Sequence, residues 1–355
     1  MDYSYKKEFS QSLVEWFHRE KRDLPWRRTS DPYKIWVSEV MLQQTRVDTV
    51  IPYYNRFIDK YPTIETLAYA PQEELLKMWE GLGYYSRARN LQSGVKEVIE
   101  KYDGTVPNNR HDISKLKGVG PYTAGAILSI AYNKPEHAVD GNVMRVLSRV
   151  LNITDDIALP KTRKIFEKAV EELIDENDPG SFNQGIMDLG AMICTPTSPK
   201  CLLCPVREFC TAFNEGDPAS LPVKSKKTKT KSEKYKVFVA RTSDGQFLLE
   251  KRSEEGLLAN MWQFPMILIE KNQEPIKKFE QTYHLQISHT VDEDFLTFKH
   301  VFSHLTWFMD CILVEVKREK DLPTHAQFFT LEQLEQYPMP VPMLKILNVL
   351  KLLTF

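Results

Sequence analysis

Two glycines one residue apart, Gly118 and Gly120, separate two helical patterns and constrain the middle of this chain more than any other feature. Both glycines can adopt a positive φ, which permits a tight turn that leaves backbone amides unpaired. Pro121 suits the first position of the helix that follows. Free amides at a helix N-terminus bind anions, and a DNA phosphate is one such anion. The spacing by itself also fits an ordinary joint between two helices.

The chain has 355 residues, enough for two or three domains with cores of their own. Residues 1–213 show apolar side chains at helical spacing, without the alternation of strands. Residues 214–234 are rich in lysine, which predicts an exposed linker or a strap that contacts phosphates. Residues 235–355 contain short β-rich runs and two helices near 274–284 and 331–336, which predicts an α+β domain. The helices predicted before the linker cover residues 5–20, 31–41, 47–58, 72–79, 84–102, 121–132, 142–152, 160–177 and 179–193.

Charge and hydropathy exclude some classes of protein. The net charge is −1, so any DNA-binding surface must be built from local patches. No run approaches the roughly 20 apolar residues that span a bilayer, and residues 1–21 lack the apolar core of a signal peptide. We therefore expect a cytoplasmic protein with no membrane partner.

Four of the five cysteines form a cluster with the spacing C-x6-C-x2-C-x5-C. So short a span predicts a four-thiolate metal site in a reducing compartment rather than a disulfide framework. The spacing does not decide between zinc and an iron–sulfur cluster. We expect the fifth, Cys311, to lie in a core. The clustered residues are Cys194, Cys201, Cys204 and Cys210.

The sequence neighbours of two acidic residues, Glu39 and Asp140, indicate whether each one is protonated. Glu39 has apolar neighbours nearly all round its helix, so burial should raise its pKa, as a general acid requires. An exposed glutamate on one polar face is the alternative. Asp140 precedes an apolar stripe that begins at Val143, which makes it a helix N-cap whose backbone bonds and dipole keep it ionised. One protonated and one ionised carboxylate are what cleavage of an N-glycosidic bond requires.

The central stretch also carries a family resemblance. LKGVGPYTA, with Val139-Asp140 placed so that the aspartate lies twenty residues after Gly120, resembles the helix–hairpin–helix and catalytic aspartate of endonuclease III-type DNA glycosylases. The resemblance implies an all-α core in which the helix–hairpin–helix, residues 112–131, binds DNA through Gly118 and Gly120. It also implies that the cysteine loop, residues 194–210, holds a 4Fe–4S cluster.

Four features narrow the resemblance to the MutY family of adenine DNA glycosylases. Tyr122 stands where bifunctional relatives carry a Schiff-base lysine, which implies a monofunctional enzyme. WVSEVMLQQT and GLGYYSRARNL resemble signatures of that family. The C-terminal domain resembles the Nudix fold, but no magnesium-binding carboxylate cluster follows WQFP, so we expect recognition rather than hydrolysis. The tripeptide Phe302-Ser303-His304 resembles the loop that reads 8-oxoguanine opposite adenine.

The same resemblance implies roles for individual residues. Glu39 would protonate adenine at N7, and Asp140 would stabilise the sugar cation. Asn142 would help to orient the water or the sugar, and Tyr122 would support the geometry in which Glu39 activates the water. For several of the remaining residues, namely Trp26, Leu42, Leu82 and Tyr84, core packing is the alternative. The extruded adenine would contact Trp26, Arg27, Leu42 and Gln184. Contacts to the mismatch and to DNA would come from Gln44, Thr45, Leu82, Tyr84, Gly118, Gly120, Phe302, Ser303 and His304.

The sequence therefore predicts a multi-domain monomer with an all-α helix–hairpin–helix core, a 4Fe–4S loop and an α+β Nudix-like C-terminal domain. Its predicted activity is removal of adenine opposite 8-oxoguanine or guanine in duplex DNA, a step of base excision repair. One alternative is an endonuclease III-like pyrimidine glycosylase with lyase activity, which Tyr122 and the second domain disfavour. Another is a non-catalytic iron–sulfur protein that binds damaged DNA, which the presence of both Glu39 and Asp140 disfavours.

Overall fold

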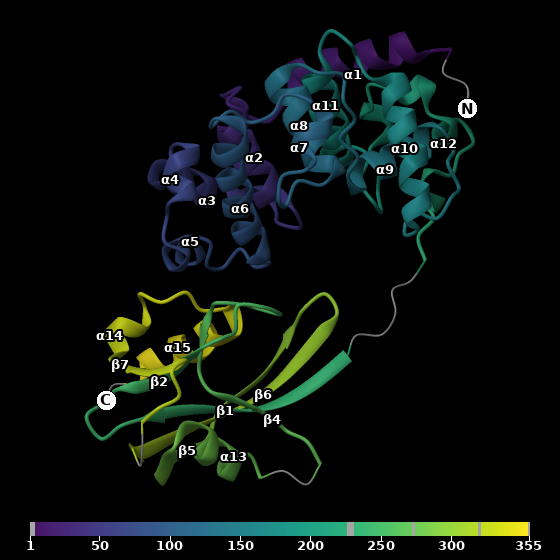
Figure 1. Cartoon of the computed structure of the whole chain (residues 1–355). Helices are drawn as coiled ribbons and strands as arrows, with labels where there is room; N and C mark the ends of the chain where they lie inside the picture. Colours follow the sequence, from purple (N-terminus) through teal and green to yellow (C-terminus); the bar gives the residue numbers. More distant parts are fainter. Residues whose placement is uncertain (1–3, 226–230, 272–273, 319–320, 354–355) are drawn as a thin grey trace. The chain divides into compact units, whose positions relative to one another are not determined.

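The computed structural model divides the chain into two compact units (Figure 1). The first unit is built from Met1–Tyr69 and Asn90–Lys226, and the second from Ala70–Arg89 and Lys227–Phe355. The sequence did not predict that Ala70–Arg89 would group with the C-terminal part of the chain. The predicted domain limits of 1–213 and 235–355 stay a prediction. The residues that the structure describes are 4–225, 231–271, 274–318 and 321–353.

The first unit is helical, and none of its described residues lies in a strand. The helices predicted there from periodicity are confirmed, whereas the pieces of three to five residues were missed because they are too short to show a period. The elements are α1 (Lys6–Glu20), η1 (Pro25–Arg27), α2 (Pro32–Leu42), α3 (Val47–Lys60), α4 (Ile64–Ala68), α6 (Ser86–Tyr102), α7 (Arg110–Ile113), α8 (Pro121–Tyr132), α9 (Gly141–Val150), α10 (Pro160–Leu173), α11 (Pro179–Met192), η2 (Cys201–Leu203), η3 (Arg207–Phe209), α12 (Thr211–Asn214) and η4 (Pro218–Ser220).

One hydrophobic core joins α1, α9, α10 and α11, and it is built from the apolar stripes of these four helices. Phe9 of α1, Val146 of α9 and Phe182 of α11 are all buried in it. The helix α2 is buried on nearly all sides and packs against α3 and α8. Because α2 carries Glu39 and α8 carries Tyr122, this packing brings two predicted site residues together.

The second unit is built around a seven-stranded sheet in the order β3-β2-β1-β6-β5, with β4 paired to β1 and β7 paired to β2. The pair β1–β6 is parallel and the other pairs are antiparallel. Its strands are β1 (Lys231–Arg241), β2 (Phe247–Lys251), β3 (Trp262–Gln263), β4 (Met266–Leu268), β5 (Leu285–Val301), β6 (Leu305–Arg318) and β7 (Ala326–Phe329). Its helices are α5 (Gln72–Met78), α13 (Pro275–Tyr283), α14 (Leu331–Leu334) and α15 (Val341–Leu352).

Both faces of this sheet are covered, as the alternation along β1 shows. Val237 and Val239 lie in the core that includes α15, whereas Phe238 belongs to the core on the opposite face with α13. There Phe238 stacks on Phe279, with ring centroids 4.2 Å apart. Successive side chains of a strand point to opposite faces, so two helical layers bury both sides of the central strands.

The structure corrects three predictions for the C-terminal part. Residues 231–234, predicted as linker, begin β1, while residues 226–230 of that linker lie outside the described part. The strand β5 was missed because much of its surface is charged and exposed, which hides its period. The helix α15 was also missed. Among the described residues, no helix has the length and apolar character needed to cross a membrane.

Candidate active site

The two predicted carboxylates line one cavity of the first unit, with a volume of about 480 Å³. Cavities of this size hold small molecules. Glu39 reaches the cavity from α2, and Asp140 reaches it from the N-cap of α9. Every residue predicted for the adenine pocket also lines this cavity, together with other predicted site residues. These lining residues are Trp26, Arg27, Leu42, Gln44, Thr45, Tyr122, Asn142 and Gln184.

Glu39 is only 6% exposed, so the alternative of a solvated glutamate is wrong. The hydroxyl of Tyr122 donates a hydrogen bond to Glu39 Oε2 over 2.6 Å. Burial raises the pKa of Glu39 to about 7, the Tyr122 bond and the charge of Arg27 lower it, and the negative charge of Asp140 raises it. Glu39 therefore holds a proton in a substantial fraction of molecules near neutral pH, as predicted for a general acid.

Asp140 caps α9 as predicted. Its Oδ1 accepts the backbone N–H of Val143 at 2.8 Å, and its Oδ2 accepts Asn142 Nδ2 at 3.0 Å. Burial nevertheless raises the pKa of Asp140 above its usual range, and these two bonds oppose that rise. Desolvation by the cavity walls outweighs the cap, and the sequence prediction that the cap keeps Asp140 ionised did not include this rise. The same bonds still favour the ionised form of Asp140.

Asn142 orients Asp140 directly. Arg145 Nη2 donates to Asn142 Oδ1 at 2.8 Å, which turns the amide nitrogen toward Asp140. The same guanidinium binds the carbonyls of Gly190 at 2.7 Å and Cys194 at 2.8 Å. A continuous set of hydrogen bonds therefore runs from the first cysteine of the cluster to the carboxylate at the head of α9.

The polar side of the pocket centres on a carboxylate that sequence reasoning missed. Asp188 of α11 is 1% exposed and accepts Arg27 Nη1 at 2.8 Å. Arg22 also donates to Asp188. Arg27 Nε in turn donates to Gln184 Oε1 at 3.1 Å. The signal was a lone aspartate inside the apolar run that ends α11, and its partners lie more than 160 residues away in sequence.

The apolar side of the pocket includes Trp26, whose ring meets Tyr54 edge-on at 5.4 Å between centroids. Trp26 is buried, so it belongs both to the core and to the cavity wall. Gln44 lines the cavity, is exposed, and has a φ of 58°, a left-handed conformation that is unfavourable for a residue with a side chain. Strained backbone of this kind occurs at functional sites, in line with the predicted contact of Gln44 to DNA.

The hairpin glycines are both exposed, but the space available for a Cβ differs between them. Gly118 has a φ of 79°, and a Cβ at this position would meet Asn90 Cβ at 2.8 Å. Gly120 is the N-cap of α8, and a Cβ there would have no atom within 4 Å. The space beside Gly120 at the N-terminus of α8 is therefore open, and the binding of a DNA phosphate there stays a prediction.

The second unit brings Tyr84 together with the predicted reading loop. Tyr84 is 47% exposed, has a φ of 47°, and its hydroxyl lies 2.6 Å from Ser303 Oγ. A cavity of about 380 Å³ is lined by Tyr84 and by the loop residues Phe302, Ser303 and His304. Leu82 is 6% exposed, so the alternative of core packing fits it.

The four clustered cysteines line one pocket together with Arg149. Arg149 is 1% exposed, and its Nη1 donates to Cys194 Sγ at 3.2 Å. A buried guanidinium needs a counter-charge, which four thiolates supply. Burial raises the pKa of the Cys204 thiol to about 12, so a metal is needed to hold it as thiolate near neutral pH.

The donor set of this pocket fits an iron–sulfur cluster. Four cysteines line it, and four thiolates are the usual ligands of a 4Fe–4S cluster. The pocket therefore fits a cluster, with Cys194, Cys201, Cys204 and Cys210 as its ligands.

Comparison with known families agrees with this geometry. Residues 37–175 match the HhH-GPD superfamily base excision DNA repair proteins, and residues 194–210 match the iron–sulfur binding domain of endonuclease III. Residues 236–349 match the NUDIX domain. The helical core, the 4Fe–4S cluster and the Nudix-like domain predicted from the sequence are thereby confirmed.

Individual proteins resemble the chain over long stretches. The adenine DNA glycosylase of Buchnera aphidicola subsp. Schizaphis graminum is 36% identical, over 97% of this chain and 99% of that protein. The structure of a thermostable thymine-DNA glycosylase is 32% identical with a TM-score of 0.55, over 60% of this chain and all of that one. A trapped endonuclease III–DNA covalent intermediate is 27% identical with a TM-score of 0.52, over 61% of this chain and 98% of that one. The chain is a DNA glycosylase, and it belongs to the adenine DNA glycosylase family.

Proposed function

We propose that this protein is a monofunctional glycosylase that hydrolyses the N-glycosidic bond of adenine opposite 8-oxoguanine or guanine in duplex DNA. The observation that carries the proposal is the cavity shared by Glu39 and Asp140, with the predicted adenine contacts on its walls. Duplex DNA that contains the mispaired adenine is the binding partner in this proposal.

The substrate adenine has to leave the helix, because its glycosidic bond is inaccessible in a stacked duplex. The cavity offers an extruded purine an apolar wall, which includes Trp26 and Leu42. Its polar wall presents Arg27 and Gln184, which are bonded to each other at 3.1 Å. An amide and a guanidinium in fixed positions can read the edge of one base, so this wall is where we place selectivity for adenine.

Cleavage then proceeds through the two carboxylates. Glu39 transfers its proton to N7 of adenine, and the C1′–N9 bond breaks with its electron pair going to the base. The sugar develops positive charge, which the ionised Asp140 stabilises. A water molecule adds to C1′ and gives its proton to Glu39, which restores the acid. The products are free adenine and an abasic site.

Tyr122 supports hydrolysis without strand cleavage. A lyase of this superfamily needs an amine that forms an imine with the sugar, and a phenol cannot form one. Tyr122 instead donates a hydrogen bond from its hydroxyl to Glu39 Oε2. We assign to Tyr122 the task of holding the Glu39 carboxyl group in position for both proton transfers.

Recognition of the opposite base is assigned to the second unit. The 8-oxoguanine base carries a hydrogen on N7 that guanine lacks, and the Ser303 hydroxyl can accept it. Ser303 and Tyr84 are both exposed and lie within hydrogen-bonding distance of each other. In this proposal the Nudix-like domain reads the lesion and does not hydrolyse nucleotides.

The test is a base-release assay on duplexes that contain A:8-oxoguanine, A:G or A:T. We expect the wild type to release adenine from the first two, with no borohydride-trapped adduct and no hydrolysis of 8-oxo-dGTP. Ser303→Ala should reduce the preference for A:8-oxoguanine over A:G by about fivefold, the worth of one hydrogen bond. Release of a pyrimidine with a trapped adduct would establish the endonuclease III-like alternative, and tight binding without turnover would establish the non-catalytic one.

A further inference from the structure

The loop that leads into Asp140 is held by side chains from several helices, and one of them also reaches the hairpin. We propose that Arg110 is a positioning residue that couples the hairpin, Gly118–Gly120, to the Asp140 loop, which we define as Glu136–Val139. The inference rests on the proposed function, because it takes the hairpin to bind DNA and Asp140 to act on the sugar.

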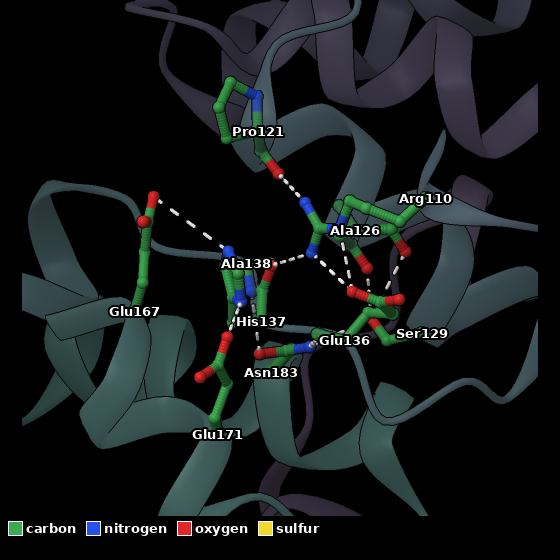
Figure 2. Close-up of polar contacts among 11 residues, drawn as sticks. Arg110, Pro121, Ala126, Ser129, Glu136, His137, Ala138, Glu167, Glu171 and Asn183 are labelled. Carbon is green, nitrogen blue, oxygen red and sulfur yellow. Dashed lines mark hydrogen bonds and ion pairs between the residues drawn. The ribbon is translucent and has the colours of Figure 1, made fainter. Parts of the chain in front are cut away.

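The backbone of the Asp140 loop is bound from three helices, as Figure 2 shows in part. Asn183 Nδ2 of α11 donates to the carbonyl of Glu136 at 2.8 Å. Arg110 Nη2 of α7 donates to the carbonyl of His137 at 3.2 Å, and Arg163 Nη2 of α10 donates to the carbonyl of Val139 at 2.7 Å. Each carbonyl is held from a different direction, so the path of the chain into Asp140 is fixed.

The loop also lies directly against α8. A Cβ on Gly125 would sit 1.8 Å from the carbonyl oxygen of His137, so this contact requires glycine. Asn183 is fully buried and binds Ser129 Oγ of α8 at 2.9 Å as well as the Asp140 loop. Gly125 and Ser129 hold the loop against the middle of α8, whereas the link from the loop to the first residue of this helix, Pro121, is made by Arg110.

Arg110 is the side chain that spans both places (Figure 2). Its Nη1 donates at 2.9 Å to the carbonyl of Pro121, which directly follows the hairpin. Its Nε donates at 2.7 Å to Glu136 Oε2. A guanidinium is planar and its donors are fixed relative to one another, so it transmits a change in position that a flexible ammonium would absorb. Glu136 neutralises its charge and keeps it turned toward the loop.

The opposite side of the loop provides a matched control. The ring of His137 faces α10, with Nδ1 3.0 Å from Glu171 Oε1, and Arg163 binds Val139 from the same helix. Like Arg110, Arg163 donates a hydrogen bond to a carbonyl of the loop, and its other hydrogen bond goes to Glu167 of its own helix. Loss of Arg163 loosens the loop, whereas loss of Arg110 also separates it from the hairpin.

The experiment is hydrogen exchange of the full chain, free and bound to a duplex with 2′-fluoro-adenosine opposite 8-oxoguanine. The fluorine withdraws electrons from the sugar and blocks cleavage. In the wild type, we expect DNA to slow exchange in peptides that cover residues 116–122 and 134–141. Arg110→Met should keep the first protection and lose the second, while Arg163→Met should keep both.

Kinetics add a second readout. Arg110→Met should lower the single-turnover rate of adenine release about tenfold, the scale of a misplaced catalytic group, with duplex affinity unchanged. Arg110→Lys keeps the charge but cannot span both carbonyls, so it should behave like Arg110→Met. Recovery of rate and protection in Arg110→Lys would instead show that Arg110 acts through its charge, and it would overturn the proposal.

Two further outcomes would also overturn it. Equal loss of protection in Arg110→Met and Arg163→Met would mean that both residues merely support the loop. Full protection of residues 134–141 in Arg110→Met would mean that the hairpin and the loop are not coupled through this side chain. Failure of the wild type to release adenine would contradict the proposed function alone, because the exchange measurements do not depend on turnover.

Discussion

The α2 wall and the α9 wall of the cavity each hold one carboxylate, and they treat it differently. On the α2 wall, Glu39 is 6% exposed in an apolar helix and accepts the Tyr122 hydroxyl. On the α9 wall, Asp140 is half-buried and accepts bonds from Val143 and Asn142. Burial raises both pKa values. Burial alone therefore does not decide which carboxyl group acts as the acid. The hydrogen-bond donors around each carboxylate decide which one loses its proton first as the pH rises.

The largest expected effect comes from replacing the carboxyl group of each wall, one at a time, with an amide. Glu39→Gln removes the proton donor, and Asp140→Asn removes the charge that faces the sugar but keeps an acceptor for the helix cap. Each should lower the single-turnover rate of adenine release at pH 7 by about a thousandfold, within the range for such groups. Duplex affinity should change little, because neither variant alters the hairpin and each replaces a carboxylate with an amide of nearly the same size.

A matched control separates charge in the cavity from helix capping. Asp178 is another aspartate N-cap in the same unit, and its Oδ1 accepts the backbone N–H of Ser181 at 3.2 Å. Asp178→Asn should leave adenine release within about twofold of the wild type. A loss as large as that of Asp140→Asn would contradict the distinction between the two walls.

The next largest effect is the dependence of the rate on pH. The pKa of Glu39 is about 7, so the acid is protonated below this pH and increasingly ionised above it. The rate of adenine release should therefore fall about tenfold per pH unit above pH 7. Burial raises the pKa of Asp140, so the loss of rate on the acid side should begin above the usual range of an aspartate. A rate that stays level up to pH 9 would remove Glu39 as the proton donor.

The sequence predicted the parts of this site that depend on local pattern. Glu39 was expected to be buried because its neighbours are apolar all round the helix, and Asp140 was expected to cap a helix because an apolar stripe follows it. The helix period and the cap are both local, since they involve residues within a few positions of each other. The helical fold of the first unit was predicted for the same reason.

The sequence did not predict what depends on distant pairing. Asp188 binds Arg27 and Arg22 across more than 160 residues, and no local pattern encodes such a partner. The grouping of Ala70–Arg89 with the second unit is another long-range outcome. The rise in the pKa of Asp140 was not predicted either, because it depends on how far the cavity walls desolvate the carboxylate.

A smaller effect is expected from the polar support of the α9 wall. Asn142→Ala removes the bond to Asp140 Oδ2 that opposes the rise in the pKa of this carboxylate. That pKa should rise further, so the acid-side loss of rate should move to higher pH. The rate at pH 7 should fall about tenfold, on the scale of a hydrogen bond to a charged group. A pH–rate profile checks this, and an unmoved acid side would mean that Asn142 does not control the protonation of Asp140.

The smallest effect is expected from the polar support of the α2 wall. Tyr122→Phe removes the hydrogen bond that lowers the pKa of Glu39, so this pKa should rise. The alkaline loss of rate should then move to higher pH, whereas Asn142→Ala, which raises the pKa of Asp140 in the same way, moves the acid-side loss of rate. The rate at pH 6 should fall by only about threefold, because Glu39 is protonated there in both proteins.

The control for this last change is Tyr33→Phe, which also removes a buried hydroxyl from α2 and its surroundings. The Tyr33 hydroxyl donates to the carbonyl of Tyr61 at 2.8 Å and does not line the cavity. Tyr33→Phe should lower the free energy of unfolding by about 1 kcal/mol and leave the pH–rate profile in place. If both variants moved the profile equally, general loosening of α2 would explain the shift, and the Tyr122–Glu39 bond would lose its special role. A shift confined to Tyr122→Phe would show that one hydroxyl controls the pKa of Glu39 on the α2 wall, as the Asn142 amide controls the pKa of Asp140 on the α9 wall.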